Sequence, residues 1–349
     1  MSESHFWRRR WKLVVNLVMI VALAGLVYVL WDQIVYTMRN LSQINAYILL
    51  LMIPIQAGNH FGQAQLYKSL FELLGRHKIN LKFLYRMSLE LNLVNNTFPT
   101  GGVSGFSYFG LRMRTKDIRA GQSTLVHMMK LLMLWVSFEV FLLAGLFMLA
   151  LGGQASNFMM LIGGSLATML IVLTIGFGVV IGSKKRINGF FTYVTKILNK
   201  VIHFIRPKHP ETIEIARVRS LFTEFHYSYV ALAGKYRSFK KPIAYALLAN
   251  LCEILTIYTV YVAFGHWVNP GAVIIAYAVA NLAGLISVLP GGVGVYEALM
   301  TAVLAAGGIP PSLSIPVTIT YRVVNMAIQI PPGYYFYHSA VNGNENDRQ

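Results

Sequence analysis

Uncharged apolar runs of membrane-spanning length recur along this chain. The first extends from Leu13 to Trp31, and an α-helix needs about twenty such residues to cross roughly 30 Å of hydrocarbon. Of the 349 residues, 56% are hydrophobic and only 12% are charged, whereas soluble domains carry about 25% charged residues. The sequence therefore predicts an all-α, polytopic membrane protein.

The basic residues lie in the connections between the apolar runs. A formal net charge of +17 would also suit a nucleic-acid-binding protein. Because Lys and Arg gather in the cytoplasmic loops of membrane proteins, their distribution predicts membrane topology instead, and we expect no nucleic-acid partner. It predicts both termini in the cytoplasm and a place in the inner cell membrane. The single cysteine, Cys252, lies in an apolar run, so we expect no disulfide framework and no cysteine metal site. We also expect no other metal site and no cofactor.

Two apolar segments are interrupted by similar short motifs. Residues 98–105 read Phe-Pro-Thr-Gly-Gly-Val-Ser-Gly, and residues 288–297 read Val-Leu-Pro-Gly-Gly-Val-Gly-Val-Tyr-Glu. Proline removes a backbone donor and glycine permits left-handed backbone, so both motifs break a helix. At membrane depth the freed backbone groups must be satisfied by protein or by a polar cavity. We therefore expect both breaks at the centre of the molecule.

The charges around the first break indicate a re-entrant hairpin over about 83–110 rather than a span. A span would place one of two basic clusters outside the cell, whereas a hairpin leaves both in the cytoplasm. The second segment, about 272–306, has a returning arm of about twelve residues, or roughly 18 Å of helix, which is too short to cross. We expect this hairpin to open to the outside. The two basic clusters are Lys68, Arg76, Lys78 and Lys82 before the first hairpin and Arg112, Arg114, Lys116 and Arg119 after it.

The remaining apolar segments predict about six full spans. With the hairpins, the order span, span, hairpin, span occurs in residues 1–156 and again, inverted, in residues 157–349. Many secondary transporters have such inverted repeats, with a substrate site at the midplane among broken helices. A basic insert over about 183–241 is predicted either to lie on anionic inner-leaflet lipids as an amphipathic helix or to be a solvated linker. The spans are about 13–31, 44–66, 123–151, 157–182, 242–265 and 313–335.

The residues around the breaks are candidates for an anion site. Both returning arms present a helix N-terminus near the midplane, and such termini attract anions. Glu297 lies in the first turn of its arm, so it is either a structural cap or a substrate- or proton-binding residue. Arg322 lies in mid-span and is a candidate phosphate-binding cation. The predicted substrate site comprises Asn95, Asn96, Pro99, Gly101, Gly102, Ser104, Pro290, Gly291, Gly292, Gly294, Glu297, Arg322 and Asn325.

Four further charges fall inside apolar segments, and they are candidates for coupling or for ion pairing. An unpaired charge at the bilayer centre costs at least about 2.5–3.5 kcal/mol, so each should pair or face water. Arg322 has two candidate partners, Glu253 and Glu297. Lys130 has the alternative of snorkelling to the inner interface. The four charges are Glu90, Lys130, Glu139 and Glu253.

The second predicted span has a polar face. Its polar side chains follow helical spacing, and Gly58 and Gly62 have the spacing of closely packed helices. The face serves either helix-to-helix hydrogen bonding or a polar cavity. Its members are Gln56, Asn59, His60 and Gln63.

The second break also carries a family resemblance. Together with the proline–glycine motif near residue 99, the stretch 289–297 resembles the family defined by the transmembrane region of lysylphosphatidylglycerol synthases, and the likeness extends over essentially the whole chain. That family includes the flippase half of multiple-peptide-resistance-factor proteins, so the resemblance implies movement of lipid between leaflets. Because the chain ends at Gln349, we expect a stand-alone member without the synthase domain. The first break departs from the family pattern: Val103, Ser104 and Gly105 stand where many members have an acidic residue and then an arginine.

Together these observations predict a flippase or transporter of an anionic phospholipid or lipid-linked intermediate, and not an enzyme. The alternative is a non-transporting membrane partner of a lipid or cell-envelope biosynthetic enzyme. A Gly-x-Ser-Gly sequence at 102–105 also has the form found in intramembrane serine proteases, with His60 or His127 as the base. Pro99 and Gly101 before the serine make the protease the least favoured interpretation. No His-Glu-x-x-His or Walker sequence occurs, which disfavours a metalloprotease and a nucleotide-driven pump.

Overall fold

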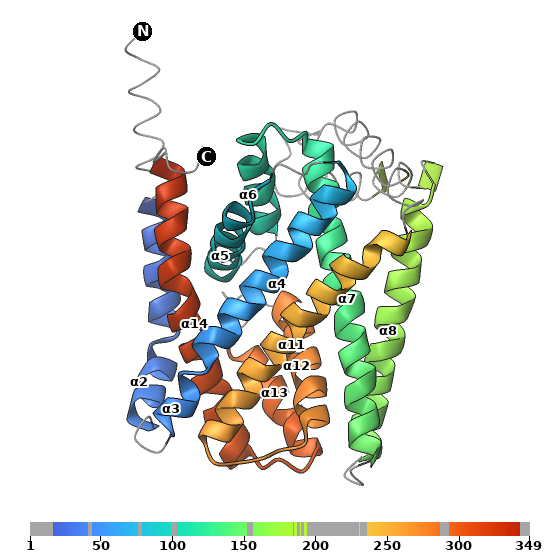
Figure 1. Ribbon diagram of the computed structural model, residues 1–349. Coiled ribbons are helices and arrows are strands. Elements are labelled where there is room, and N and C mark those ends of the chain that lie inside the picture. The colour runs from blue at the N-terminus through green and yellow to red at the C-terminus, as the bar shows by residue number, and fades with distance from the viewer. Residues whose placement is uncertain are drawn as a thin grey trace, which may run out of the picture.

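The computed structural model shows an elongated bundle of helices (Figure 1). It describes residues 17–40, 44–75, 79–98, 103–151, 156–183, 236–286 and 293–342, together with 185, 186, 189, 192, 193 and 230. Within these residues every regular element is helical and no strand occurs. The predicted all-α class is therefore confirmed.

A helix over 17–29 comes first in the described chain. Polar caps begin several of the elements that follow: Asn45 and Asn80 accept hydrogen bonds from backbone N–H groups two residues ahead, and Ser156 accepts one from Met159. The elements are α2 (Trp31–Asn40), α3 (Ala46–Leu49), α4 (Met52–Leu73), α5 (Leu81–Thr97), α6 (Val103–Arg114), α7 (Ala120–Leu151), α8 (Asn157–Ile181), η2 (Tyr236–Phe239), α11 (Lys240–Ala263), α12 (Pro270–Ile286), α13 (Val295–Ala306) and α14 (Pro311–Asn342).

Three of the described helices, α7, α8 and α11, are long and apolar enough to cross a membrane. A fourth candidate is the helix over 17–29 taken together with α2, which is bent by 55°. Within the first predicted span, over about 13–31, the described helix covers 17–29, bends at Leu30 and continues as α2 to Asn40, so this span stays a prediction. Helices α4 and α14 have 22 and 32 residues but are not among these apolar candidates. Both carry the polar side chains described below, and the predicted count of six spans stays a prediction.

Helices α4 and α11 pack closely at the centre of the bundle, where they run side by side across it (Figure 1). A Cβ atom on Gly62 would lie 3.0 Å from the backbone nitrogen of Ala249 and 3.1 Å from the carbonyl oxygen of Tyr245. A Cβ atom on Gly58 would lie 3.1 Å from the sulfur of Cys252. The predicted close packing through these two glycines is confirmed, since a larger residue would hold the helices apart.

The helix pairs on either side of the two breaks lie in opposite halves of the bundle. Figure 1 shows α5 and α6 in the upper half and α12 and α13 in the lower half, and the two helices of each pair pack against each other. The connection from α6 to α7 lies at the upper end, whereas that from α13 to α14 lies at the lower end (Figure 1). The joining segments, 99–102 and 287–292, lie outside the described residues.

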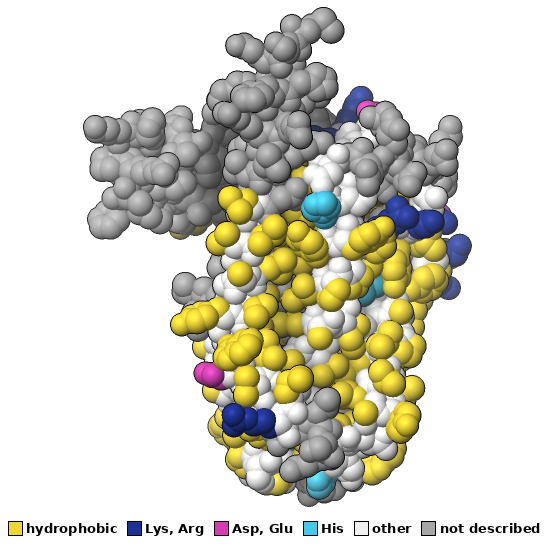
Figure 2. Space-filling model, turned by 90° about the vertical axis from the view of Figure 1, so that its left-hand side faces the viewer, with side chains coloured by type: hydrophobic (Ala, Val, Ile, Leu, Met, Phe, Trp, Pro, Cys, Tyr) yellow, Lys and Arg dark blue, Asp and Glu magenta, His cyan; other side chains and the backbone are white. Residues whose placement is uncertain are grey.

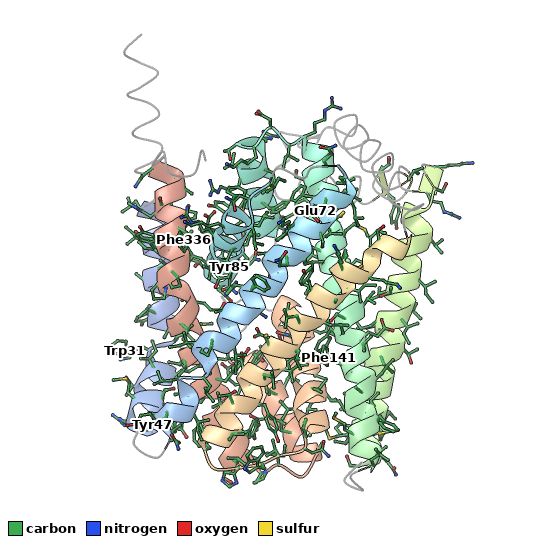
Figure 3. All side chains as sticks on the ribbon, in the orientation of Figure 1. Trp31, Tyr47, Glu72, Tyr85, Phe141 and Phe336 are labelled. Atoms are coloured by element: carbon green, nitrogen blue, oxygen red, sulfur yellow. The ribbon has the colours of Figure 1, made fainter. Side chains whose placement is uncertain are left out.

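The two ends of the bundle differ in charge. The upper connection between α6 and α7 contains Lys116, Asp117 and Arg119. The sequence segments between α7 and α8, between α11 and α12, and between α13 and α14 contain no Lys, Arg, Asp or Glu. Figure 2 shows a largely hydrophobic flank with most of its Lys and Arg side chains near the upper end. Trp31 and Tyr47 lie on the lower flank (Figure 3) and are 58% and 85% exposed.

Candidate functional site

Helix α13 begins beside the second break, and its first turn holds a buried carboxylate. Glu297 is 9% exposed, and its Oε2 accepts a hydrogen bond of 2.6 Å from the backbone N–H of Gly294. Gly294 has φ +86, in the left-handed region that glycine adopts without strain. Glu297 therefore caps α13, which is the structural role of the two predicted for it.

Glu297 also receives two side-chain donors from other helices. Arg322 of α14 forms an ion pair with Glu297 Oε1, and its guanidinium lies 5.0 Å from the ring centre of Tyr296. Gln33 Nε2 of α2 donates to the same oxygen at 2.9 Å. Of the two carboxylates predicted as partners of Arg322, the structure selects Glu297. We call Gln33, Gly294, Glu297 and Arg322 the Glu297 site.

The donors of the Glu297 site are of the kinds that bind anions. A backbone N–H at a helix N-terminus and a guanidinium both form charge-assisted hydrogen bonds with carboxylates and with phosphates. Because Glu297 and Arg322 are both buried, water screens their interaction less than it would at the surface. The Glu297 carboxylate thus occupies an anion-binding position inside the protein.

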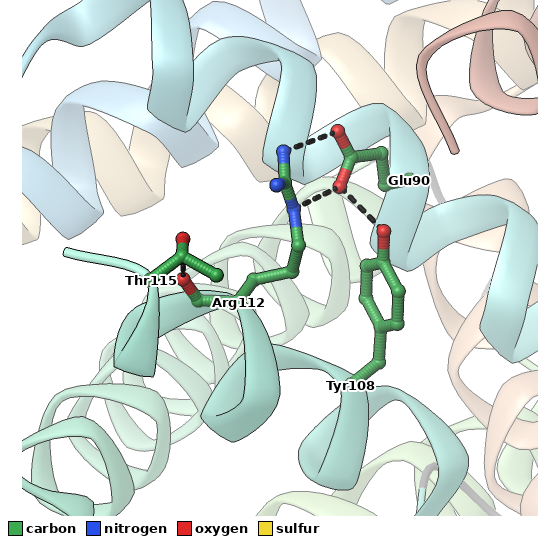
Figure 4. A network of polar contacts seen from close by, with 4 residues as sticks. All are labelled: Glu90, Tyr108, Arg112 and Thr115. Carbon is green, nitrogen blue, oxygen red and sulfur yellow. Dashed lines mark hydrogen bonds and ion pairs between the residues drawn. The ribbon is translucent and has the colours of Figure 1, made fainter. Parts of the chain in front are cut away.

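A second buried ion pair joins the two helices beside the first break (Figure 4). Arg112 of α6 binds Glu90 of α5 in bidentate fashion, with Nε–Oε2 at 2.9 Å and Nη2–Oε1 at 3.1 Å. The hydroxyl of Tyr108, one turn before Arg112, donates to Glu90 Oε2 at 2.7 Å. The prediction that Arg112 belongs to a cytoplasmic loop is wrong: the residue is 8% exposed, because α6 continues to Arg114.

A third network leads from Lys130 of α7 to Glu253 of α11 through two amides of α4. Lys130 Nζ donates to Gln63 Oε1 at 2.8 Å, Gln63 Nε2 to Asn59 Oδ1 at 2.7 Å, and Asn59 Nδ2 to Glu253 Oε2 at 3.2 Å. We call Gln63 and Asn59 the amide bridge. Lys130 is 8% exposed and lies 5.2 Å from the ring centre of Tyr67. The alternative that it snorkels to the interface is therefore wrong.

Glu253 also accepts hydrogen bonds from Tyr321 and Gln56. Tyr321 of α14 donates to Oε1 at 2.7 Å, and Gln56 of α4 donates to Oε2 at 3.3 Å. Gln329 Nε2 then donates to Gln56 Oε1 at 3.1 Å and to Asn325 Oδ1 at 2.6 Å. The polar face of α4 thus forms hydrogen bonds between helices, and Asn325, predicted beside Arg322, is hydrogen-bonded into the Glu253 network.

The other predicted site residues are spread more widely. Asn96 donates to Asn92 within α5, and the side chain of Asn95 packs against Gly105. Ser104 lies in the first turn of α6. Glu139 is partly exposed on α7, and no hydrogen bond or salt bridge joins it to another described residue. Six predicted residues lie outside the described residues: Pro99, Gly101, Gly102, Pro290, Gly291 and Gly292.

The two histidines proposed as protease bases have other neighbours. His60 Nδ1 shares a hydrogen bond of 3.1 Å with Ser88, and His127 Nδ1 shares one of 2.8 Å with Tyr67. Among the described residues, no group of three or more His, Cys, Asp or Glu side chains could hold a metal ion.

The sequence matches one protein-family model over most of its length. The family model for the lysylphosphatidylglycerol synthase transmembrane region matches residues 13–333. The chain belongs to this family. It is therefore a membrane protein, and the predicted resemblance is confirmed.

Relatives of this family member occur among archaeal UPF0104 membrane proteins. One from Methanothermobacter thermautotrophicus is 30% identical over 129 residues, which is 37% of this chain and 38% of that protein. One from Pyrococcus horikoshii is 23% identical over 182 residues, or 52% and 54% of the two chains. One from Methanocaldococcus jannaschii is 22% identical over 325 residues, or 89% of each chain. The match spans less than two thirds of the first two relatives. No solved structure matches the chain.

Proposed function

We propose that this protein moves an anionic phospholipid, or an anionic lipid-linked intermediate, across the cell membrane. The observation that carries the proposal is the Glu297 site: a buried anion held by a helix N-terminus, an amide and a guanidinium beside a helix break. The same donors suit a lipid phosphate. We propose that the phosphate takes the position of the Glu297 carboxylate during transport.

In this proposal, replacement of the Glu297 carboxylate by a lipid phosphate at Arg322 has a low free-energy cost. A buried arginine without a counter-ion is costly, so Arg322 must keep an anionic partner throughout. When a phosphate replaces the Glu297 carboxylate, one charge-assisted pair replaces another. The Gly294 N–H and Gln33 Nε2, which donate hydrogen bonds to Glu297, can then donate to the phosphate instead. After the lipid leaves, Glu297 returns to Arg322 and restores the cap of α13.

The distribution of charge sets the orientation in this proposal. Lys and Arg favour the cytoplasmic side, so we place the upper end of Figure 1, where α14 ends, in the cytoplasm, in agreement with the prediction that both termini are cytoplasmic. The pair α5 and α6 is then a re-entrant hairpin that enters from the cytoplasm, and α12 and α13 form one that enters from outside. Trp31 and Tyr47 lie where the outer membrane interface is expected to place aromatic side chains. The two hairpins belong to inverted repeats, as in many transporters.

A reconstituted transport assay tests the proposed function. The protein is placed in vesicles that carry labelled phospholipids with anionic or zwitterionic headgroups, and the appearance of label in the opposite leaflet is measured. We expect faster crossing of anionic lipids than in protein-free vesicles. The Arg322→Gln variant should lose about tenfold to a hundredfold in rate, because a hydrogen bond to a charged group contributes roughly 1.5–3 kcal/mol.

Two further variants separate transport from folding. Arg119→Gln is the matched control, since Arg119 is an exposed cation in the α6–α7 connection, and its rate should equal that of the wild type. Glu297→Gln/Arg322→Gln removes both charges, so it should fold and still fail to transport. Crossing no faster than in protein-free vesicles for every anionic headgroup refutes the proposal and favours a role as a non-transporting partner.

A further inference from the structure

The three carboxylates of the polar networks are held in different ways. Glu90 and Glu297 are each paired with an arginine. Among the described residues Glu253 forms no salt bridge, and its three donors, the side chains of Tyr321, Gln56 and Asn59, are neutral. Protonation of Glu90 or Glu297 would leave a buried arginine without its counter-ion, whereas protonation of Glu253 would not. Glu253 is therefore the carboxylate whose charge can change at the lowest cost.

The titratable groups near Glu253 do not exchange protons in place of Glu253 near neutral pH. Tyrosines from three helices surround it, and Cys252 is its neighbour on α11; phenols and thiols are mostly protonated at neutral pH. On α4, His60 shares a hydrogen bond with Ser88, and its charged neighbour is Lys130. On α7, Lys130 is joined to Glu253 through the amide bridge. The tyrosines are Tyr277 of α12, Tyr296 of α13 and Tyr321 of α14.

The amide bridge makes Lys130 sensitive to the charge on Glu253. All three hydrogen bonds are donated in one direction, from Lys130 toward Glu253. Hydrogen bonds in such a chain polarise one another, so the bridge connects a cation to a carboxylate without direct contact. When Glu253 is neutral, the last bond loses its charged acceptor and the chain weakens.

Helix α14 connects Glu253 to the Glu297 site. Tyr321 donates to Glu253, and the next residue, Arg322, is paired with Glu297. Protonation of Glu253 removes the charge that assists the Tyr321 hydrogen bond. The segment of α14 that carries Arg322 is then held less tightly, which favours exchange of Glu297 for another anion.

The networks balance in charge only when Glu253 is ionised. They contain the three cations Arg112, Lys130 and Arg322 and the three carboxylates of Glu90, Glu253 and Glu297. With Glu253 protonated, the networks carry one excess positive charge, which the single negative charge of a lipid phosphodiester would cancel.

We propose that Glu253 binds one proton and carries it with each anionic headgroup; this inference rests on the proposed lipid transport. The carboxylate accepts the proton from water and becomes a neutral carboxyl group. When the headgroup has left, Glu253 returns the proton to water on the other side of the membrane. Lipid and proton thus move in the same direction, and the step is electrically neutral.

Infrared difference spectra between acidic and alkaline buffer test the proton site without any transport. The full-length protein in bilayers should show the C=O stretch of a protonated carboxyl group at acidic pH. Glu253→Gln should lose a component of this band that Glu139→Gln keeps, because Glu139 lies outside the networks. A spectrum of Glu253→Gln identical to that of the wild type overturns the proposal.

A transport experiment with a pH gradient tests the coupling. For one proton per lipid, a gradient of one pH unit should accumulate labelled anionic lipid in one leaflet up to about tenfold. Glu253→Gln resembles the protonated state, so it should move lipid but leave the two leaflets equal. Accumulation by Glu253→Gln, or none by an active wild type, overturns the coupling while lipid transport stands. If the wild type moves no lipid but the infrared component is present, the proposed function fails and the proton site stands.

Discussion

Replacing Arg112 by methionine is expected to lower the free energy of unfolding by about 3–5 kcal/mol. The substitution leaves Glu90, which is 1% exposed, as a buried charge without its bidentate partner, and removal of one member of a buried pair has a cost of this size. The Tyr108 hydroxyl remains a donor to Glu90, but a neutral hydroxyl cannot replace a guanidinium. Unfolding of the purified protein in detergent measures the loss.

A double-mutant cycle decides whether the pair is responsible. Glu90→Gln/Arg112→Met removes both charges and keeps an acceptor for Tyr108, so its stability should return most of the way to that of the wild type. Arg114→Met is the matched control, because Arg114 is an exposed cation on the same helix, and it should change stability by less than about 0.5 kcal/mol. If the single and double variants lose the same stability, Glu90 and Arg112 do not act as a pair.

Local sequence chemistry predicts the bounds of one of the helices beside the breaks. The sequence predicts the returning arm of the second hairpin over about twelve residues ending at 306, and α13 spans Val295–Ala306. Glycine and proline act on their own backbone and that of their neighbours, so their effect can be read without knowledge of the fold. The apolar runs likewise predicted the positions of α7, α8 and α11.

The partners of the buried charges could not be read in this way. Gln33 and Glu297 are 264 residues apart in the chain, and nothing in the local sequence of either residue indicates the other. The sequence predicts Arg112 in a loop because Gly110 marks the end of its predicted arm, whereas α6 continues to Arg114 and buries Arg112 against Glu90. Helical spacing did hold a signal here, since Tyr108 and Arg112 are one turn apart and reach the same carboxylate.

Replacing Gly62 by leucine is expected to lower stability by about 3 kcal/mol, at the upper end of the usual cost of overpacking. The new Cβ would already lie within 3.1 Å of two backbone atoms of α11, and backbone cannot move aside as a flexible side chain can. Gly164→Leu on α8 is the matched control: no atom lies within 4 Å of its Cβ position, so this variant should be neutral or gain up to about 1 kcal/mol from helix propensity. Thermal unfolding of both variants measures the difference.

The same substitution should also disturb the Glu253 network. Gly62 lies next to Gln63 and one turn after Asn59, so forcing α4 away from α11 lengthens the 3.2 Å hydrogen bond from Asn59 to Glu253 and separates Lys130 from the carboxylate at the far end of the amide bridge. We expect Gly62→Leu to lose its transport response to a pH gradient even where enough protein folds to be assayed, whereas Gly164→Leu keeps it. If Gly62→Leu is as stable as Gly164→Leu, the close approach at Gly62 does not hold α4 and α11 together. The expected loss of the hydrogen bond from Asn59 to Glu253 would then be wrong as well.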